Sequence, residues 1–277
     1  MMIESAADTK TALYCVLGDP VAHSLSPVMH NRAFAHHSLN AVYLAFRVTE
    51  LEAAIGGLRA LDIRGASITL PHKSRVMAYL DDIDPVAAEI GAVNTIINEK
   101  GRLIGKNSDV SGAVEALRAK TDPAAKKVLI LGAGGAARAV GYGVRSAGSR
   151  VTIANRSPEA GAALAADLEV DFLPLADAIP DHFDILINTT PVGMHPTHAV
   201  SPIPGDRLST DMVVMDIIYN PLETRLLKAA RRAGCRTIDG LAMFVNQGAR
   251  QFEWWTGREA PVNLMRQVVM EKLREFI

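Results

Sequence analysis

Short runs of apolar residues alternate with longer amphipathic stretches along most of the chain. The short runs have the length and composition of buried strands, and the stretches between them have the spacing of helices. Strands that alternate with helices in this way predict open, mostly parallel α/β sheets. The expected strands lie near residues 11–17, 41–48, 63–70, 93–98, 102–104, 128–131, 150–154, 170–173, 184–188, 212–218 and 235–239.

Residues with known preferences for the first helical turn mark the helix starts. Ser26 and Pro27 suit the N-cap and the first helical position, and Thr49 and Glu52 have the spacing of a capping box. Between two strands, Lys100-Gly101 predicts the turn of a hairpin. The expected helices begin near Ser26, Thr49, Pro71, Asp84, Ser108, Ala136, Leu241 and Val262.

A glycine-rich turn follows the apolar run 128–131 and precedes an alanine-rich helix. Gly132, Gly134 and Ala137 have the spacing G-x-G-x-x-A, a permitted form of the dinucleotide-binding fingerprint. The helix N-terminus behind the turn offers free N–H groups and the positive end of a dipole to phosphates. We therefore predict a cofactor contact along the turn Gly132, Ala133, Gly134, Gly135 and Ala136.

The end of the next strand indicates which dinucleotide is bound. A site that prefers NAD usually has an acid there for the ribose 2′-hydroxyl. This chain instead has Asn155, Arg156 and Ser157, a cation and two hydrogen-bonding side chains that suit a 2′-phosphate. The segment predicts NADP as the cofactor; the alternative is a surface arginine in a loop.

The length and the order of the elements predict two domains. Thr121, Asp122 and Pro123 separate the first group of strands from the second, and two helices without further strands follow residue 240. We expect a substrate-binding domain at 1–120, completed by helices at 241–277, and a Rossmann-type dinucleotide-binding domain at 121–240. The cleft between two such domains is the natural place for an active site.

Composition and charge narrow the class of partner. The chain has 49% apolar and 21% charged residues and a net charge of −1, which argues against a nucleic acid or an anionic membrane as its main partner. Cys15 and Cys235 lie far apart in apolar runs, so we expect free thiols in a reducing cytosol and no metal site. Without an apolar leader or a membrane-length run, the sequence predicts a cytoplasmic protein.

Several polar residues of the first half lie at strand ends and loop starts, where open α/β sheets place ligand contacts. Two hydroxyls at Ser24 and Ser26 suit a carboxylate, and a lysine beside an aspartate is a workable proton-transfer pair. Each residue alone also fits a cap, a turn former or a solvated charge. The candidates are Ser24, Ser26, Thr69, Lys73, Asn94 and Asp109.

Taken together, these segments resemble the shikimate dehydrogenase family. The opening segment of that family is similar to Gly18-Asp-Pro-Val-Ala-His-Ser-Leu-Ser-Pro-Val-Met-His-Asn31. Further family motifs follow in order over nearly the whole chain: Ser67-Ile-Thr-Leu-Pro-His-Lys73, Gly91-Ala-Val-Asn-Thr95, Asn107-Ser-Asp109, Gly132-Ala-Gly-Gly-Ala136, Asn155-Arg-Ser157, Asn188-Thr-Thr-Pro-Val-Gly-Met194, Asp216-Ile-Ile-Tyr-Asn-Pro221 and Asp239-Gly-Leu-Ala-Met243 with Gln247.

The resemblance implies reversible, NADPH-dependent reduction of 3-dehydroshikimate to shikimate in aromatic amino-acid biosynthesis. It implies that Lys73 is the general acid/base, with Asp109 as its partner at the reacting hydroxyl, and that Ser24 and Ser26 hold the substrate carboxylate. It further implies ring-hydroxyl contacts from Thr69, Asn94, Tyr219 and Gln247, and nicotinamide contacts from Ile217, Gly240 and Met243.

Departures from the family pattern leave alternatives open. Val110 and Lys106 flank the Asn107–Asp109 motif where other residues are common, and Ala160 stands where a second arginine often supports NADP. The alternatives are a quinate/shikimate or amino-shikimate dehydrogenase, a non-catalytic NADP-binding sensor, and a related methylene-tetrahydrofolate dehydrogenase, against which Ser24, Ser26 and Gln247 argue. Apolar residues near Trp254 and Trp255 pack within the chain or across a homodimer.

Overall fold

The computed structural model describes residues 7–275, which divide into two compact units. The chain passes from the first unit to the second between Ser108 and Asp109 and returns between Asn246 and Gln247. The predicted boundaries at 120 and 240 therefore fall inside the second unit. The termini included in the predicted domains, residues 1–6 and 276–277, lie outside the described residues.

Helix α4 (Asp109–Arg118) accounts for the earlier first boundary. Its buried residues Ala113, Ala116 and Leu117 belong to the apolar cluster of the second unit. Its Val114 packs so closely on Gly143 that a Cβ on that glycine would lie 2.9 Å from Val114 Cγ2. Close packing of this kind attaches α4 to the unit that follows it.

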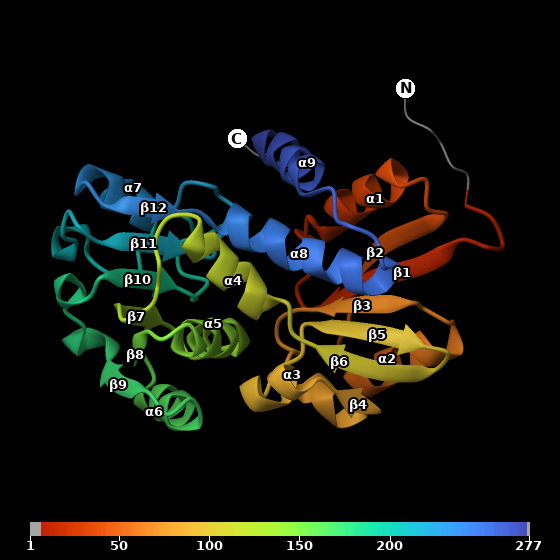
Figure 1. Ribbon diagram of the computed structural model, residues 1–277, viewed down its shortest axis with the longest axis horizontal. Helices are drawn as coiled ribbons and strands as arrows, with labels where there is room; N and C mark the ends of the chain where they lie inside the picture. Colours follow the sequence, from red (N-terminus) through yellow and green to blue (C-terminus); the bar gives the residue numbers. More distant parts are fainter. Residues whose placement is uncertain (1–6, 276–277) are drawn as a thin grey trace. The chain divides into compact units, whose positions relative to one another are not determined.

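The first unit is built on a six-stranded sheet in the order β2-β1-β3-β5-β6-β4 (Figure 1). Strand β1 pairs in parallel with β2 and β3, whereas β5 is antiparallel to both β3 and β6. Lys100 and Gly101 have φ angles of 54° and 93°, as expected for the predicted hairpin turn. The strands are β1 (Ala12–Gly18), β2 (Ala41–Arg47), β3 (Gly65–Ile68), β4 (Asp82–Ile83), β5 (Thr95–Glu99) and β6 (Arg102–Lys106).

Both faces of this sheet are covered. Alternate side chains such as Cys15 and Leu17 pack with Ile55 of α2 on one face, while Tyr14 contacts Phe34 of α1 and Trp255 of α8 on the other. Helices α1 and α9 pack against each other (Figure 1). The helices are α1 (Ser26–His36), α2 (Leu51–Ala60), the short η1 (Arg75–Tyr79), α3 (Pro85–Ile90), the part of α8 (Gly240–Thr256) from Gln247, and α9 (Val262–Arg274).

Helix α1 begins at Ser26 as predicted, but two predicted N-caps and the helix start at Pro71 differ from the structure. Leu25 holds the N-cap of α1, one residue before Ser26, and Glu50 holds that of α2 without the predicted capping box at Thr49. Pro71 lies in a turn, and the short helix begins only at Arg75. The start of α3 is confirmed, because Asp84 Oδ1 accepts a hydrogen bond from Val86 N at 3.0 Å.

The second unit has a six-stranded, all-parallel sheet in the order β12-β11-β10-β7-β8-β9 (Figure 1). This is the strand order of a doubly wound dinucleotide-binding fold, with β7 and β10 at its switch point. Its elements are α4, β7 (Lys127–Leu131), α5 (Gly135–Ser146), β8 (Arg150–Asn155), α6 (Pro158–Asp167), β9 (Asp171–Pro174), η2 (Leu175–Asp177), η3 (Pro180–His182), β10 (Ile185–Asn188), η4 (Gly205–Arg207), β11 (Val213–Asp216), α7 (Arg225–Arg232), β12 (Arg236–Ile238) and the first turns of α8.

Apolar side chains on both faces of this sheet are buried, as the continuous runs of the sequence predicted. Val128 and Ile130 pack with residues of α4, α5 and α6, whereas Leu129 and Leu131 pack with residues of α7. The chain is thus an α/β protein with two sheets, the second of Rossmann type. Among the described residues, no helix has the length and apolar character needed to cross a membrane.

Candidate functional site

The predicted phosphate-binding turn lies at the switch point of the second sheet, between β7 and α5. Gly132 has a φ of 115°, and a Cβ there would lie 2.7 Å from Thr189 Oγ1, so both its backbone and its neighbour require glycine. A Cβ at Gly134 would instead meet no described atom within 4 Å beyond its chain neighbours. Gly134 is also the N-cap of α5 and supplies no side-chain cap. The turn therefore leaves room and backbone donors for a diphosphate.

The end of β8 presents the residues predicted for the 2′-phosphate. Arg156 is exposed, and Asn155 Nδ2 donates to the carbonyl of Ser157 at 3.0 Å. Ser157 Oγ donates to Glu159 Oε2 at 3.1 Å, so an acid that the sequence interpretation passed over lies beside this segment. Hydrogen bonds from its own backbone N–H and from Ser157 lower the pKa of the Glu159 carboxyl. The segment can bind a phosphate through Arg156, next to a competing carboxylate.

The residues predicted to lie near the nicotinamide come together at the loop after β11 and the start of α8. A Cβ on Gly240 would lie 2.3 Å from Ile217 O and 2.4 Å from Ile218 C, so the helix start crosses directly over the loop backbone. Met243, one turn further on, is buried in the cluster that Ile217 packs against. Tyr219 stacks on Phe244 with ring centroids 4.4 Å apart.

A buried carboxylate beneath this loop carries no predicted role. Asp216 Oδ1 accepts hydrogen bonds from Asn188 Nδ2 at 3.0 Å and from Ile218 N at 3.1 Å, and its Oδ2 accepts one from Thr224 Oγ1 at 2.7 Å. Burial raises the pKa of the Asp216 carboxyl to about 6, although these hydrogen bonds oppose the rise. The cluster ties the ends of β10 and β11 to the start of α7. In the sequence, its position at the end of a buried strand and at the start of the Asp216–Pro221 motif marked it without indicating a role.

In the first unit, the two predicted carboxylate-binding serines lie in one loop. Ser24 Oγ accepts the backbone N–H of Ser26 at 3.3 Å, and Ser26 is buried at the first turn of α1. Thr69, after β3, packs so tightly over Gly18 that a Cβ on this glycine would lie 2.3 Å from Thr69 Cγ2. The glycine that ends β1 therefore makes room for a side chain from the neighbouring strand.

Lys73 lies in the turn that connects β3 to η1. Its backbone carbonyl accepts a hydrogen bond from Val93 N at 2.8 Å, which holds the turn against the segment before β5. The neighbouring His72 is buried, and its Nε2 lies 2.9 Å from the carbonyl oxygen of Val48. His72 thus anchors the turn that carries Lys73.

Asn94 is buried at the start of β5, within a network that includes Gln247. Its Oδ1 accepts Ser108 N at 2.8 Å, and its Nδ2 donates to Ser108 Oγ at 2.9 Å. Ser108 Oγ in turn lies 3.4 Å from Gln247 Oε1 on α8. The structure therefore brings Asn94 and Gln247 together through Ser108, a residue that the sequence interpretation had not singled out.

Asp109, the predicted partner of Lys73, is the buried first residue of α4 in the second unit. Its unusual neighbours have structural roles. Val110 Cγ1 lies 3.2 Å from the position of a Cβ on Gly143, so it packs on α5. Lys106 Nζ lies 5.1 Å above the ring of Trp254 and 3.7 Å from Asp84 Oδ2.

Neither tryptophan is a free apolar surface. Trp254 lies under Lys106, while Trp255 packs against Tyr14 and donates from Nε1 to the carbonyl of Ile96 at 3.0 Å. Both side chains are half-buried. The sequence left open whether these two residues pack within the chain, and the structure shows that they do.

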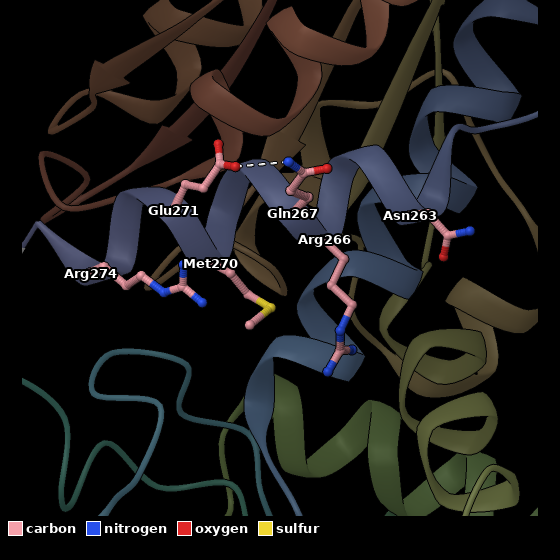
Figure 2. A pocket seen from close by; sticks show the side chains of 6 residues that line it. All are labelled: Asn263, Arg266, Gln267, Met270, Glu271 and Arg274. Carbon is pink, nitrogen blue, oxygen red and sulfur yellow. Dashed lines mark hydrogen bonds between the residues drawn. The ribbon is translucent and has the colours of Figure 1, made fainter.

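A shallow polar pocket of about 300 Å³ lies along α9 (Figure 2). Gln267 Nε2 donates a hydrogen bond to Glu271 Oε1 at 2.8 Å, which Figure 2 marks with a dashed line. None of the residues predicted to bind substrate or cofactor lines it; its lining residues are Asn263, Arg266, Gln267, Met270, Glu271 and Arg274. Within residues 7–275, no group of three or more His, Cys, Asp or Glu side chains is placed to hold a metal ion.

Comparison with known proteins finds two family models that match parts of the chain. Residues 16–96 match the shikimate dehydrogenase substrate binding domain, and residues 240–270 match the shikimate 5′-dehydrogenase C-terminal domain. A curated relative from Moorella thermoacetica, named shikimate dehydrogenase (NADP(+)), is 50% identical over 95% of this chain and 94% of its own.

Solved structures agree. A shikimate dehydrogenase in complex with NADP+ is 43% identical, with a TM-score of 0.94 over 99% of both chains. The enzyme from Thermus thermophilus, in complex with NADP(H) and shikimate, is 39% identical, with a TM-score of 0.87 over 94% of this chain and 99% of its own. A quinate dehydrogenase from Corynebacterium glutamicum in complex with NAD is 30% identical, with a TM-score of 0.88 over 94% and 99% of the two chains. The chain therefore belongs to the shikimate dehydrogenase family.

Proposed function

We propose that this protein is a shikimate dehydrogenase that reversibly reduces 3-dehydroshikimate to shikimate with NADPH, a step of aromatic amino-acid biosynthesis. The observation that carries the proposal is the 50% identity, over 95% of the chain, with a relative named for this activity. The two units supply what the reaction needs: a strand-end site with a lysine, and a dinucleotide fold. Bound NADPH supplies the hydride.

The chain's own residues hold the substrate and move the proton. Ser24 and Ser26 hold the substrate carboxylate, and Asp109 orients the reacting oxygen beside Lys73. Lys73 Nζ would give a proton to the ketone oxygen as the ketone becomes the alcohol, and would take that proton back in the reverse direction. Ring hydroxyls bind to Thr69, Asn94, Tyr219 and Gln247.

For the cofactor, the residues present fit NADP. The open backbone at Gly134 and the uncapped N-terminus of α5 fit the diphosphate. Arg156, with Asn155 and Ser157, would hold the 2′-phosphate. Ile217, Gly240 and Met243 would hold the nicotinamide. In the turn, Ala133, Gly135 and Ala136 would complete the contacts to the diphosphate.

Replacement of Lys73 tests the mechanism. Lys73→Ala is expected to lower kcat for shikimate oxidation by about 10²- to 10⁴-fold, the usual contribution of a general acid/base, with the Kd of NADP+ unchanged. Lys228→Ala, an exposed lysine on α7, is the matched control and should retain wild-type turnover. Near-normal turnover by Lys73→Ala would exclude the proposed role.

A second candidate function is that of a quinate/shikimate dehydrogenase, favoured by the likeness to the quinate dehydrogenase structure and by Glu159 beside Ser157. Steady-state oxidation of shikimate and of quinate, each with NADP+ and with NAD+, separates the two. We expect shikimate to be preferred over quinate, and NADP+ over NAD+, each by more than about tenfold, or about 1.4 kcal/mol. Comparable rates with quinate or NAD+ would favour the alternative, and no turnover with any pair would favour the NADP-binding sensor.

The proposed setting is the cytoplasm, supported by Cys15 and Cys235, which are both free and buried. The proposed partners are small molecules, with neither nucleic acid nor membrane as a partner. A homodimer stays a prediction, which light scattering of the purified protein tests. With Trp254 and Trp255 packed within the chain, the apolar residues exposed on edge strand β2, Leu44 and Phe46, are the ones to mutate if a dimer is found.

A further inference from the structure

A chain of buried hydrogen bonds runs through the first unit from β2 to Asn94. Tyr43 Oη donates to Ser67 Oγ at 2.6 Å, and Ser67 Oγ donates to Gln251 Oε1 at 2.8 Å. Gln251 Nε2 donates to Thr95 Oγ1 at 2.9 Å, and Thr95 Oγ1 donates to Asn94 Oδ1 at 2.7 Å. All five side chains are buried, and Gln251 is 1% exposed. Gln251 therefore connects a network that joins α8 to three strands.

Backbone groups at two places determine which side chain donates and which accepts in each of these hydrogen bonds. A backbone N–H can only donate and a backbone C=O can only accept. Ser108 N donates to Asn94 Oδ1 at 2.8 Å, and the carbonyl of Asn94 accepts from Gln251 Nε2 at 3.2 Å. The amide of Asn94 must therefore present its oxygen to Ser108 N, and the amide of Gln251 must present its NH₂ group to Asn94.

The protonation states of Tyr43 and of its neighbour His30 agree with this direction of the hydrogen bonds. Burial raises the pKa of Tyr43 well above its usual value of 10, so the phenol keeps the proton that it donates to Ser67. The ring of His30, stacked on Tyr43 at 4.6 Å, is neutral, because burial lowers the pKa of this imidazole to about 3. The path from Tyr43 to Asn94 therefore consists of neutral groups with one consistent proton order.

We propose that Gln251 is a positioning residue that holds Asn94 with its NH₂ group as a donor to a ring-hydroxyl oxygen of shikimate. Gln251 holds Asn94 at two points: directly at its backbone carbonyl, and through Thr95 at its side-chain oxygen. The inference rests on the proposed function, which assigns Asn94 to the substrate. The inference adds that Gln251, on α8 one helical turn after Gln247, makes the site at Asn94 selective for a substrate oxygen that accepts a hydrogen bond.

A double-mutant cycle tests this role. Gln251→Met keeps the length of the side chain and removes its donors and acceptor. In the otherwise wild-type protein it should raise the Kd of shikimate about tenfold, the effect of one ordinary hydrogen bond, and should raise KM more than it changes kcat. In the Asn94→Ala background the same substitution should change the Kd less than about twofold, because the residue that it positions is gone. The Kd of NADP+ should stay at its wild-type value in every variant.

Trp255→Phe is the matched control. It removes another hydrogen bond from α8 to the same strand, at the Ile96 carbonyl. The ring of Trp255 also packs against Tyr43, and phenylalanine keeps an aromatic ring there while every hydrogen bond between Tyr43 and Asn94 stays in place. It should lower the free energy of unfolding and leave the Kd of shikimate unchanged. If Gln251→Met does not fold, Thr95→Val cuts the same chain at the next link and takes its place in the cycle.

The outcomes separate this inference from the proposed function. If Gln251→Met leaves the Kd unchanged, or raises it by the same factor with and without Asn94, Gln251 does not act through Asn94 and the inference is wrong. An equal loss of shikimate affinity in Trp255→Phe would also overturn it, since a general weakening of α8 would then suffice. Wild-type protein that binds NADP+ but not shikimate would overturn the proposed function and, with it, this inference.

Discussion

Gly240→Ala is a test of how tightly the start of α8 constrains the loop predicted to contact the nicotinamide. The added Cβ would lie 2.3 Å from Ile217 O and 2.4 Å from the carbonyl carbons of Ile217 and Ile218. Ordinary contacts between such atoms are about 1 Å or more longer. Because all three atoms belong to the backbone, no side-chain rotation relieves the overlap. Either the helix start or the loop must move by about 1 Å.

A movement of this size has two expected costs. Overpacking of a well-packed site lowers the free energy of unfolding by about 1–3 kcal/mol. A misplacement of about 1 Å in a residue that positions substrate or cofactor lowers the rate by about 10²-fold. We therefore expect kcat/KM for shikimate with NADP+ to fall about 100-fold, or about 2.7 kcal/mol in transition-state stabilisation. Binding of 2′,5′-ADP, which needs only the phosphate-binding segment, should be unchanged.

Steady-state kinetics, thermal unfolding and 2′,5′-ADP titration measure these three quantities. The matched control is Gly56→Ala in the exposed face of α2, where a Cβ would meet no described atom within 4 Å beyond its own helix and chain neighbours. This control should gain about 0.5–1 kcal/mol in stability from helix propensity and keep wild-type kinetics. A folded Gly240→Ala variant with wild-type kcat/KM would refute the reasoning, because the contact would then be without consequence for the loop.

Three further predictions concern charge. Arg156→Ala should raise the KM of NADP+ by about 10- to 100-fold, as loss of a charge-assisted bond implies, and leave that of NAD+ unchanged; parallel changes would exclude a 2′-phosphate contact. Glu159→Gln should lower the KM of NADP+ about twofold, because the carboxylate beside Ser157 is removed, and a higher KM would contradict this interpretation. The pKa of Asp216 is about 6 in the folded protein and 3.8 in the unfolded chain, so the folded state holds this proton more tightly. Its stabilising contribution is therefore complete below pH 3.8 and is lost as pH rises through 6. Relative to Asp216→Asn, wild type should lose about 2 kcal/mol of unfolding free energy between pH 4 and 7, and parallel curves would contradict this.

Much of the first unit's fold followed from short-range pattern. The hairpin at Lys100-Gly101 and the cap at Asp84 were correctly predicted, because in each the local residues provide the turn or cap themselves. The caps at Ser26 and Thr49 were wrong, because Leu25 and Glu50 hold the two N-cap positions and neither makes a side-chain cap bond. Residue preference alone therefore did not decide these two helix starts.

The sequence by itself determined which kinds of residue stand at the candidate site of each half. It has a glycine turn after a buried strand, an arginine just after the next strand of that half, and a lysine at a strand exit of the other half, because each of these depends on neighbours within a few residues. Only the tertiary structure decided what surrounds them. Gly240 lies against Ile217, and Asp216 accepts a hydrogen bond from Thr224. Gln251 accepts a hydrogen bond from Ser67 and donates one to the carbonyl of Asn94. Most of these contacts join residues far apart in the chain, and they depend on burial and on the direction of hydrogen bonds, which no local pattern encodes.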